Sequence, residues 1–177
     1  MNIIGRNNNL KFYLHKSFKS QLFLPISYYI SWKLENDWDD YNELYHAINY
    51  INNIKNEKDV WFDIHTIQRD NKIIGVLTIV GGKIENLGIQ YDKETDNTLL
   101  LKYFHIVEKG AGLGSYWLKS IIFPYYQEKD YSKIFVSSSH PKSFNFYRKL
   151  GKEIMSNTKS SDNKLYNRQS KTFLIYL

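Results

Sequence analysis

Residues 99–118 read LLLKYFHIVEKGAGLGSYWL, and this stretch decides which fold the rest of the sequence is expected to adopt. Its first part, Leu99 to Val107, is apolar and aromatic and long enough for a strand. Three glycines follow at alternate positions, Gly110, Gly112 and Gly114, and lead into an aromatic-rich segment with helical spacing. Such an arrangement forms an anion site, because glycines let a ligand approach the backbone and the first N–H groups of a helix have no partner. A phosphate group is therefore the expected ligand.

Two common phosphate-binding motifs do not fit these glycines. The P-loop has Lys and then Ser or Thr directly after its last glycine, whereas Ser115 follows Gly114. The dinucleotide motif GxGxxG, started at Gly110, requires a glycine where the chain has Leu113. Started at Gly112, the motif places its third glycine on Ser115. The sequence excludes both classes of nucleotide site at this loop.

A third motif does fit the loop. Lys109-Gly110-Ala111-Gly112-Leu113-Gly114 resembles the pyrophosphate-binding loop of the GCN5-related N-acetyltransferases (GNAT). In that family a strand is followed by a basic residue or Gln, two further residues, Gly, one residue, and Gly or Ala. Gly-rich turns are common, so the match needs support from elsewhere in the chain.

The support comes from the segment after the next predicted strand, which covers Lys133 to Ser139. Residues 140–151 read HPKSFNFYRKLG, with Pro141 suited to the first position of a helix and Gly151 to its end. GNAT proteins carry a helix of the form Asn-x-x-Ala-x-x-φ-Tyr-x-x-x-Gly in this place, where φ is apolar. Tyr147 and Gly151 match outright, Phe146 is the apolar residue, and Ser143 and His140 replace Ala and Asn.

The two motifs together imply the fold and the activity. The resemblance implies one GNAT-like domain over residues 1–177, of the α/β (α+β) class, with a mixed, mostly antiparallel central sheet flanked by helices. It implies an acetyl-CoA-dependent N-acetyltransferase that moves an acetyl group from the CoA thioester to a primary amine, carried by a small molecule or a peptide. Acetyl-CoA is the implied co-substrate, and no metal is implied.

The resemblance also assigns site residues. The backbone of Lys102, Tyr103 and Phe104 is expected to bind the pantetheine arm. The pyrophosphate is assigned to Lys109, Gly110, Ala111, Gly112, Leu113, Gly114 and Ser115. His140, in place of Asn, can still donate one hydrogen bond to the cofactor. Tyr147 is the expected general acid, because a phenol with a pKa of about 10 is protonated at pH 7 and can donate to the departing thiolate.

The general base stays open. Many relatives use a glutamate near the start of the cofactor strand or on the following strand, where this chain has Thr98 and Phe135. The remaining candidates are Glu85, Tyr103, His105 or ordered water.

Two other functions compete with the enzyme hypothesis. The missing glutamates favour a catalytically silent acyl-CoA-binding or interaction module, whereas Tyr147 favours catalysis. The formal net charge of +6 is the sole support for an acetyltransferase directed at RNA or aminoacyl-tRNA. The Lys and Arg residues are scattered rather than gathered in a run, so the charge is better explained by attraction of anionic CoA, and no nucleic-acid partner is expected.

Length and composition bear on the number of domains, on cysteine chemistry and on location. The chain of 177 residues fits one domain, and the absence of Cys excludes disulfides and cysteine nucleophiles. The start of the chain shows no secretion signal and no stretch of membrane-spanning length, so a cytoplasmic protein without a membrane partner is expected. His46 and His65 are interpreted as structural rather than as metal ligands. A homodimer stays open.

Periodicity predicts the remaining elements. The expected strands cover Leu10–His15, Val60–Gln68, Ile73–Val80, Ile84–Tyr91, Lys152–Asn157 and Lys171–Tyr176, with a bend at Gly81-Gly82, a turn at Asp92–Asn97 and a loop at Thr158–Lys164. Two helices are expected between Ile26 and Asn56, with a bend near Asn36. After the glycine loop, Leu113, Trp117, Ile121 and Tyr125 predict an apolar helical stripe that Pro124 kinks or ends.

An acidic cluster lies between the two expected helices. It consists of Asp37, Asp39, Asp40 and Glu43. Negative charge at a helix start complements the helix dipole, and this is the preferred interpretation. The alternative is a counter-charge for a cationic amine acceptor, because in GNAT proteins this connection borders the acceptor site.

Overall fold

The structure is a computed structural model that describes residues 1–36, 41–88, 97–161, 164 and 167–177. Its strands are β1 (Asn2–Asn7), β2 (Leu10–His15), β3 (Val60–Arg69), β4 (Lys72–Gly82), β5 (Thr98–Ile106), β6 (Lys133–Ser138), β7 (Lys152–Ser160) and β8 (Asn167–Tyr176). Its α-helices are α1 (Leu24–Glu35), α2 (Glu43–Ile54), α3 (Leu113–Trp117), α4 (Phe123–Gln127) and α5 (Pro141–Arg148). Short 3₁₀ helices cover Ser20–Phe23 and Ile84–Leu87, and a π-helical segment, Leu118–Ile122, joins α3 to α4.

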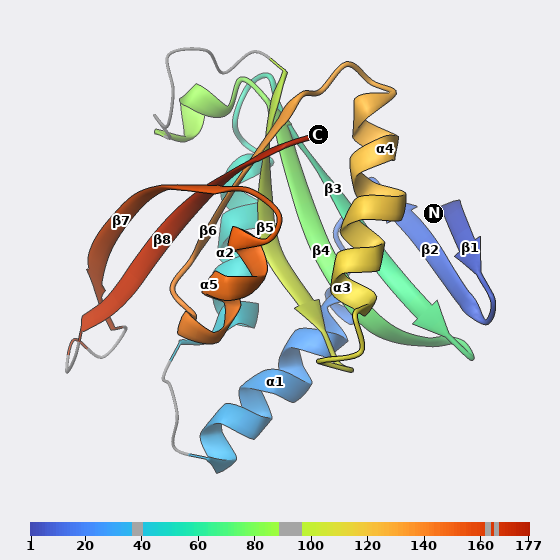
Figure 1. The fold of residues 1–177 in the computed structure, drawn as a ribbon, viewed down its shortest axis with the longest axis horizontal. Helices are drawn as coiled ribbons and strands as arrows, with labels where there is room; N and C mark the ends of the chain where they lie inside the picture. Colours follow the sequence, from blue (N-terminus) through green and yellow to red (C-terminus); the bar gives the residue numbers. More distant parts are fainter. Residues whose placement is uncertain (37–40, 89–96, 162–163, 165–166) are drawn as a thin grey trace.

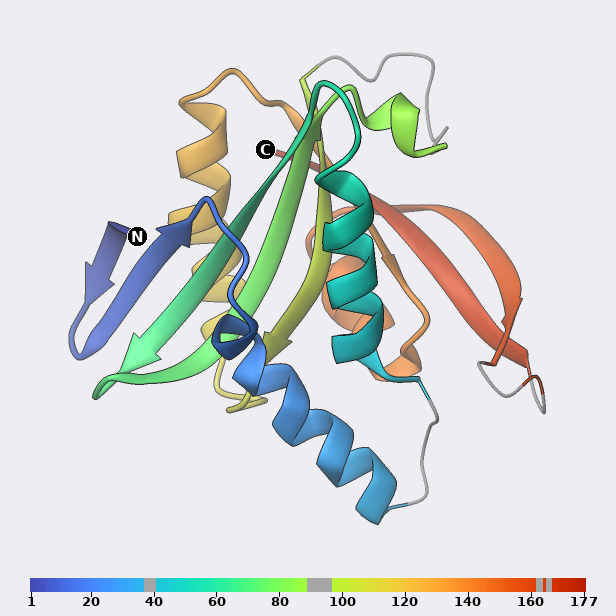
Figure 2. The same cartoon turned by 180° about the vertical axis from the view of Figure 1, so that it is seen from behind.

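All eight strands form one sheet in the order β1-β2-β3-β4-β5-β6-β8-β7 (Figure 1). Neighbouring strands are antiparallel except β5 and β6, which are parallel. Helices α3, α4 and α5 lie on one face of the sheet, and α1 and α2 lie on the other (Figures 1 and 2). The predicted class, a mixed and mostly antiparallel sheet flanked by helices, is confirmed.

Alternation along the strands divides the core between the two faces. On β5, Leu99 and Leu101 belong to the cluster beneath α3 and α4, which contains Trp117 and Tyr126. Leu100, between them, belongs to a cluster on the α2 side with Ile54. The central strand is therefore apolar on both faces, which explains the continuous apolar run of its sequence.

Pro124 does not end the helix after the glycine loop. An α-helical turn would press the proline ring against the carbonyl of residue 120, but the π-helical segment widens the turn, and Phe123 donates its N–H to Leu118 O instead. The extra residue shifts the buried stripe by one position. Ile122 and Tyr126 are fully buried, whereas the predicted Ile121 and Tyr125 are only half-buried, so the predicted stripe is wrong beyond Trp117.

Three further expectations differ from the structure. The sequence interpretation missed β1, which pairs with β2. The strand predicted from Ile84 is instead a 3₁₀ helix that ends at Gly88 with φ +68, and residues 89–91 lie outside the described chain. The loop predicted from Thr158 begins later, because β7 continues to Ser160. The predicted turn at 92–97 lies outside the described residues except for Asn97.

Candidate functional site

The parallel strands β5 and β6 separate part-way along their length. Their pairing begins at Thr98 with Lys133 and ends at Leu101 with Val136, although β5 continues to Ile106 and β6 to Ser138. Beyond Leu101 the two strands diverge, and we call the opening between them the wedge (Figure 1). The β5 backbone on this side makes no ladder with β6, so its polar groups can bind an extended ligand.

A bulge marks the point at which β5 leaves β6. On the other side of β5, His105 pairs with Val76 and Lys102 with Thr78, so two residues, Tyr103 and Phe104, oppose one residue of β4. Tyr103 has φ +51, a left-handed conformation that is uncommon for an aromatic residue. The predicted pantetheine segment, Lys102 to Phe104, therefore lies at the mouth of the wedge.

The glycine loop connects the end of β5 to α3. Gly110 and Gly112 have φ +84 and +74, which L-residues with a Cβ rarely adopt, and a Cβ added at either position would meet no atom within 4 Å. Gly114 has a different role, because an added Cβ would lie 3.3 Å from Phe104 Cζ. The first backbone bond of α3 runs from Tyr116 N–H to Gly112 O, so the preceding N–H groups have no partner within the helix. Open space and unpaired donors fit a diphosphate.

Lys109 does not point away from the protein as a simple surface lysine. Its Nζ lies 3.9 Å from the centre of the Tyr29 ring, on α1. The residue as a whole is exposed, but partial burial of the ammonium lowers its pKa. Lys109 thus joins the glycine loop to the helix on the opposite face of the sheet.

His140 caps α5 and bridges it to α1. Its Nδ1 accepts the N–H of Lys142 at 3.2 Å, and its Nε2 lies 2.6 Å from Tyr29 Oη. Because Nδ1 is an acceptor, the neutral ring carries its proton on Nε2 and donates it to Tyr29. The one donor that the sequence interpretation reserved for the cofactor is therefore engaged with Tyr29.

Tyr147 lies on α5 with its ring in the core. The ring centre is 5.5 Å from that of Phe173, and burial raises the pKa of the phenol, so the hydroxyl stays protonated. In the described part of the chain the hydroxyl has no hydrogen-bond partner, yet it is not sealed from solvent. The preceding residue, Phe146, contacts Phe104 at the wedge with ring centres 5.8 Å apart.

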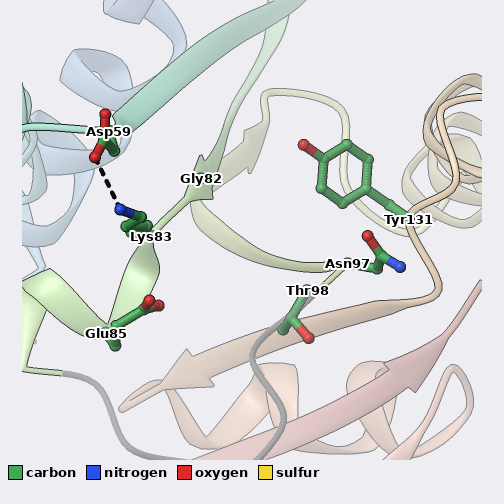
Figure 3. Close-up of a pocket in the computed structure, with 7 residues that line it drawn as sticks. All are labelled: Asp59, Gly82, Lys83, Glu85, Asn97, Thr98 and Tyr131. Carbon is green, nitrogen blue, oxygen red and sulfur yellow. Dashed lines mark hydrogen bonds and ion pairs between the residues drawn. The ribbon is translucent and has the colours of Figure 1, made fainter.

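The three side chains that are candidates for the general base lie in different regions. Glu85 lies with Thr98 around a hollow of about 220 Å³ (Figure 3). This hollow is at the first residue of β5, about 17 Å along the strand from the bulge at about 3.3 Å per residue. Tyr103 donates its hydroxyl to His46 O at 2.9 Å, and burial raises its pKa. His105 faces α1, opposite to Phe104 as predicted, with its ring centre 4.9 Å from that of Tyr29.

His105 is neutral at physiological pH. Its pKa is lowered to about 3, first by burial and then by the positive charges of Lys109 and other nearby basic groups. A neutral imidazole beside the wedge can accept a proton or position a water molecule, whereas Glu85 is at the far end of the strand. Of the three side-chain candidates, His105 is the one near the wedge whose ring can accept a proton, because the Tyr103 hydroxyl already donates to His46 O.

The acidic cluster is described only at Glu43. Both oxygens of this carboxylate lie 2.8 Å from Nζ of Lys33, which is 1% exposed and also bonds Tyr41 O at 2.5 Å. Asp37, Asp39 and Asp40 lie outside the described residues. Glu43 therefore neutralises a buried lysine, a role that the sequence interpretation did not include.

Tyr29 is the site residue that the sequence interpretation missed. The sequence interpretation gave it no role beyond a place in the first helix expected after Ile26, whereas it contacts His105, Lys109 and His140, which come from three segments around the wedge. One weak sequence signal for Tyr29 was available. Tyr29 and Lys33 are four residues apart and therefore share one helix face, and in the structure Lys33 Nζ lies 5.2 Å from the centre of the Tyr29 ring.

Comparison with solved structures identifies this arrangement. A GNAT family acetyltransferase from Elizabethkingia anophelis, solved with acetyl-CoA bound, matches with a TM-score of 0.56 at 15% identity over 97% of this chain and 100% of that one. The chain has the GNAT fold. No protein-family model and no curated protein sequence matches it.

Two further GNAT-fold matches cover almost the whole chain. A ribosomal-protein-alanine N-acetyltransferase from Brucella melitensis has a TM-score of 0.59 at 14% identity, over 93% of this chain and 99% of that one. An N-acetyltransferase from Staphylococcus aureus has the same TM-score at 12% identity, over 93% and 98%. At sequence identities this low, the likeness shows a shared fold and nothing beyond it.

Within the described ranges, no group of three or more His, Asp or Glu residues is placed to hold a metal ion. No helix among the same residues combines the length and the apolar character needed to cross a membrane.

Proposed function

We propose that the protein is an acetyl-CoA-dependent N-acetyltransferase that acts on a primary amine. The observation that carries this proposal is the wedge between β5 and β6, which has the glycine loop at the end of one arm and α5 at the end of the other. A wedge of unpaired strand backbone suits an extended pantetheine arm, and the loop beside it suits a diphosphate.

Each residue of the site has a proposed role. Backbone groups of Lys102 to Phe104 hold the pantetheine, and the N–H groups of Gly110 to Ser115 hold the pyrophosphate, with Lys109 supplying positive charge. Acetyl-CoA supplies an acetyl group that is activated as a thioester. The amine nitrogen forms a bond to the acetyl carbon while the carbon–sulfur bond breaks, and the amine proton leaves to His105 or water.

Tyr147 is the proposed general acid. Its phenol is protonated at neutral pH, and its hydroxyl is engaged by no described residue, so it is available to give its proton to the departing sulfur. Its proton balances the charge that develops on the thiolate.

A catalytically silent acyl-CoA-binding module is the second candidate. The silent module is favoured by the two positions at which many GNAT proteins carry a glutamate. This chain has Thr98 and Phe135 there, and both side chains are buried in the sheet and supply no carboxylate. Such a module would bind CoA and release no thiol.

One assay separates the two candidates. Purified protein is incubated with acetyl-CoA and a panel of primary amines, and free thiol is measured beside CoA binding by calorimetry. Thiol release that depends on the amine supports the enzyme, CoA binding without release supports the silent module, and absence of CoA binding contradicts both.

A further inference from the structure

Tyr29 contacts both sides of the wedge. On the side of β5, its ring centre lies 4.9 Å from that of His105, and Lys109 Nζ lies 3.9 Å from the same ring centre. On the side of β6, Tyr29 Oη lies 2.6 Å from Nε2 of His140, the residue that caps α5. One side chain from α1 therefore spans the opening between the two strands.

The hydrogen bond between Tyr29 and His140 joins elements from opposite faces of the sheet. Helix α1 lies on one face and α5 on the other (Figures 1 and 2). Where strands pair, the sheet keeps such helices apart, but β5 and β6 stop pairing after Leu101 and Val136. The bond lies beyond this point, because His140 comes after the last residue of β6, Ser138. It links the two faces where the sheet itself is open.

Three hydrogen bonds fix His140 at the start of α5. Its backbone N–H donates to Ser138 Oγ at 3.1 Å, and its carbonyl oxygen accepts from Ser143 Oγ at 2.8 Å. Its Nδ1 accepts the N–H of Lys142 at 3.2 Å, which sets the orientation of the ring and directs the proton on Nε2 at Tyr29. The β6 side of the contact is therefore held by its own turn.

The ring of Tyr29 is held at the other end of the bond. Lys33, one turn further along α1, places its Nζ 5.2 Å from the centre of this ring, and both carboxylate oxygens of Glu43 on α2 lie 2.8 Å from the same Nζ. Lys33 and Lys109 thus both make cation–π contacts with Tyr29. These contacts involve the ring and not the hydroxyl, so they remain when the hydroxyl alone is removed.

The path assigned to the pantetheine arm runs beside Tyr29. Backbone groups up to Phe104 are assigned to this arm, and the diphosphate is assigned to the loop that begins at Lys109. Tyr29 contacts His105, directly after the first segment, and Lys109, at the start of the second. An arm that extends from the loop to the bulge therefore passes the residue that spans the wedge.

We propose that Tyr29 is a positioning residue for the pantetheine arm, acting through His140 to hold the two sides of the wedge at a fixed separation. A site that already has its bound shape loses less conformational freedom when the ligand binds, and this raises affinity. The inference rests on the proposed function, because it requires acyl-CoA in the wedge. It gives a role to the one donor of His140, which is engaged by Tyr29 rather than kept for the cofactor.

The first experiment separates the pantetheine arm from the diphosphate. CoA and 3′-phospho-ADP, which carries the diphosphate without pantetheine, are titrated by calorimetry into the wild type and two variants. Tyr29→Phe removes one hydroxyl and keeps the ring, and Tyr28→Phe makes the same change at the exposed neighbour. We expect Tyr29→Phe to weaken CoA binding about three- to tenfold and 3′-phospho-ADP binding less than about twofold, and Tyr28→Phe to leave both within about twofold.

The outcomes of this titration differ between possible roles of Tyr29. A loss confined to CoA supports the inference, and retained binding of 3′-phospho-ADP also shows that the variant is folded. An equal loss for both ligands would place the effect on the diphosphate through Lys109 and overturn the inference. Unchanged CoA affinity overturns it as well. Tighter CoA binding would mean that the hydrogen bond obstructs the wedge, which also overturns it.

The second experiment tests whether Tyr29 acts through His140. His140→Asn keeps a side-chain acceptor at the start of α5, because Asn is a favourable N-cap residue, but it removes the imidazole that reaches Tyr29. In the His140→Asn background, Tyr29→Phe should change CoA affinity by less than about twofold. A loss as large as in the wild-type background would show that Tyr29 acts independently of His140, and it would overturn the inference.

Kinetics with acetyl-CoA separate this inference from the proposed function. Tyr29→Phe should raise KM for acetyl-CoA by about the factor that it costs in CoA affinity, and leave kcat within about twofold. CoA binding that depends on Tyr29, without thiol release from any amine, contradicts the proposed activity and leaves the inference standing. Thiol release with an unchanged KM in Tyr29→Phe overturns the inference and leaves the activity standing. Wild-type protein that binds no CoA contradicts both.

Discussion

The hydroxyl of Tyr126 donates a hydrogen bond to Asp63 Oδ2, 2.9 Å away, in the layer between α4 and the sheet. Nε2 of His65 lies 2.8 Å from the same hydroxyl and donates to it, because the phenol proton is already committed to the carboxylate. Lys16 Nζ lies 2.7 Å from Asp63 Oδ1, as an ion pair rather than a well-directed hydrogen bond. This buried network fixes the position of α4 on β3, and the π-helical segment is what brings Tyr126 to it.

Tyr126→Phe is expected to lower the free energy of unfolding by about 2–4 kcal/mol. The change leaves the His65 donor and an oxygen of Asp63 without their partner inside the core, and each unsatisfied group costs about 1–3 kcal/mol. Tyr125→Phe, at a half-buried position, is the matched control and should cost less than about 1 kcal/mol. Urea denaturation of both variants measures the difference, and equal losses would show that the network does not hold the helix.

His65 is expected to make the protein less stable in mild acid. Burial lowers its pKa to about 3, whereas the unfolded ring titrates near 6.5. Between these values the unfolded chain binds a proton that the folded protein does not, so the stabilisation is complete above pH 6.5 and is lost as the pH falls towards 3. At pH 5 the loss from this one residue is about 2 kcal/mol.

The variant His65→Gln tests this pH dependence, because its amide can still donate to Tyr126 but does not titrate. The free energy of unfolding is measured at pH 7.5 and pH 5.0 in both proteins. The drop between the two pH values should be smaller by about 2 kcal/mol in His65→Gln. Equal drops would mean that the folded protein protonates His65 as readily as the unfolded chain does.

The central part of the fold was predictable because its signals are local. Gly110 and Gly112 have the positive φ values for which glycine is suited, and Pro141 begins α5 as its position indicated. Strand β1 carried weaker signals, since none of its residues is buried and its sequence lacks an apolar alternation. The run of asparagines after it was a usable hairpin signal, because asparagine tolerates the positive φ that Asn8 adopts in this turn, +50.

The remaining features depend on contacts that sequence spacing does not carry. The π-helical segment follows from the conflict between Pro124 and the need to keep the helix packed on the sheet, so a regular period of 3.6 residues assigned the wrong residues to the core. The contact between Tyr29 and His140 joins residues 111 positions apart. Because of this contact, the N–H of His140 donates to Tyr29, and this can be seen only when the positions of α1 and α5 are known.

Gly112→Asp is expected to weaken CoA binding at least about tenfold, because it places a carboxylate beside the proposed diphosphate site. Gly88→Asp is a matched control, since Gly88 also has positive φ, +68, and open space around it, but ends the 3₁₀ helix after β4. Both variants should lose about 1–2 kcal/mol of stability from the strained backbone. Calorimetry should find the loss of CoA affinity in Gly112→Asp alone, and equal affinity in the two variants would remove the glycine loop from the site.

Tyr147→Phe separates catalysis from packing at the proposed general acid. The ring of Tyr147 packs on Phe173, and no described group bonds its hydroxyl, so removal of the oxygen keeps the packing and leaves no buried partner unsatisfied. Stability and CoA affinity should therefore change little. If the phenol protonates the departing thiolate, the chemical step should slow by about 10²–10⁴-fold.

The rate is measured in a single turnover, because product release can hide a slower chemical step under steady-state conditions. Tyr131→Phe, which changes a tyrosine at the far end of β5, is the control and should keep its rate. A loss of rate confined to Tyr147→Phe, with an unchanged melting temperature, would assign the proton to this residue. A variant that keeps more than about a third of the wild-type rate would be incompatible with general acid catalysis of that size, and Tyr147 would then serve only to pack α5 against β8.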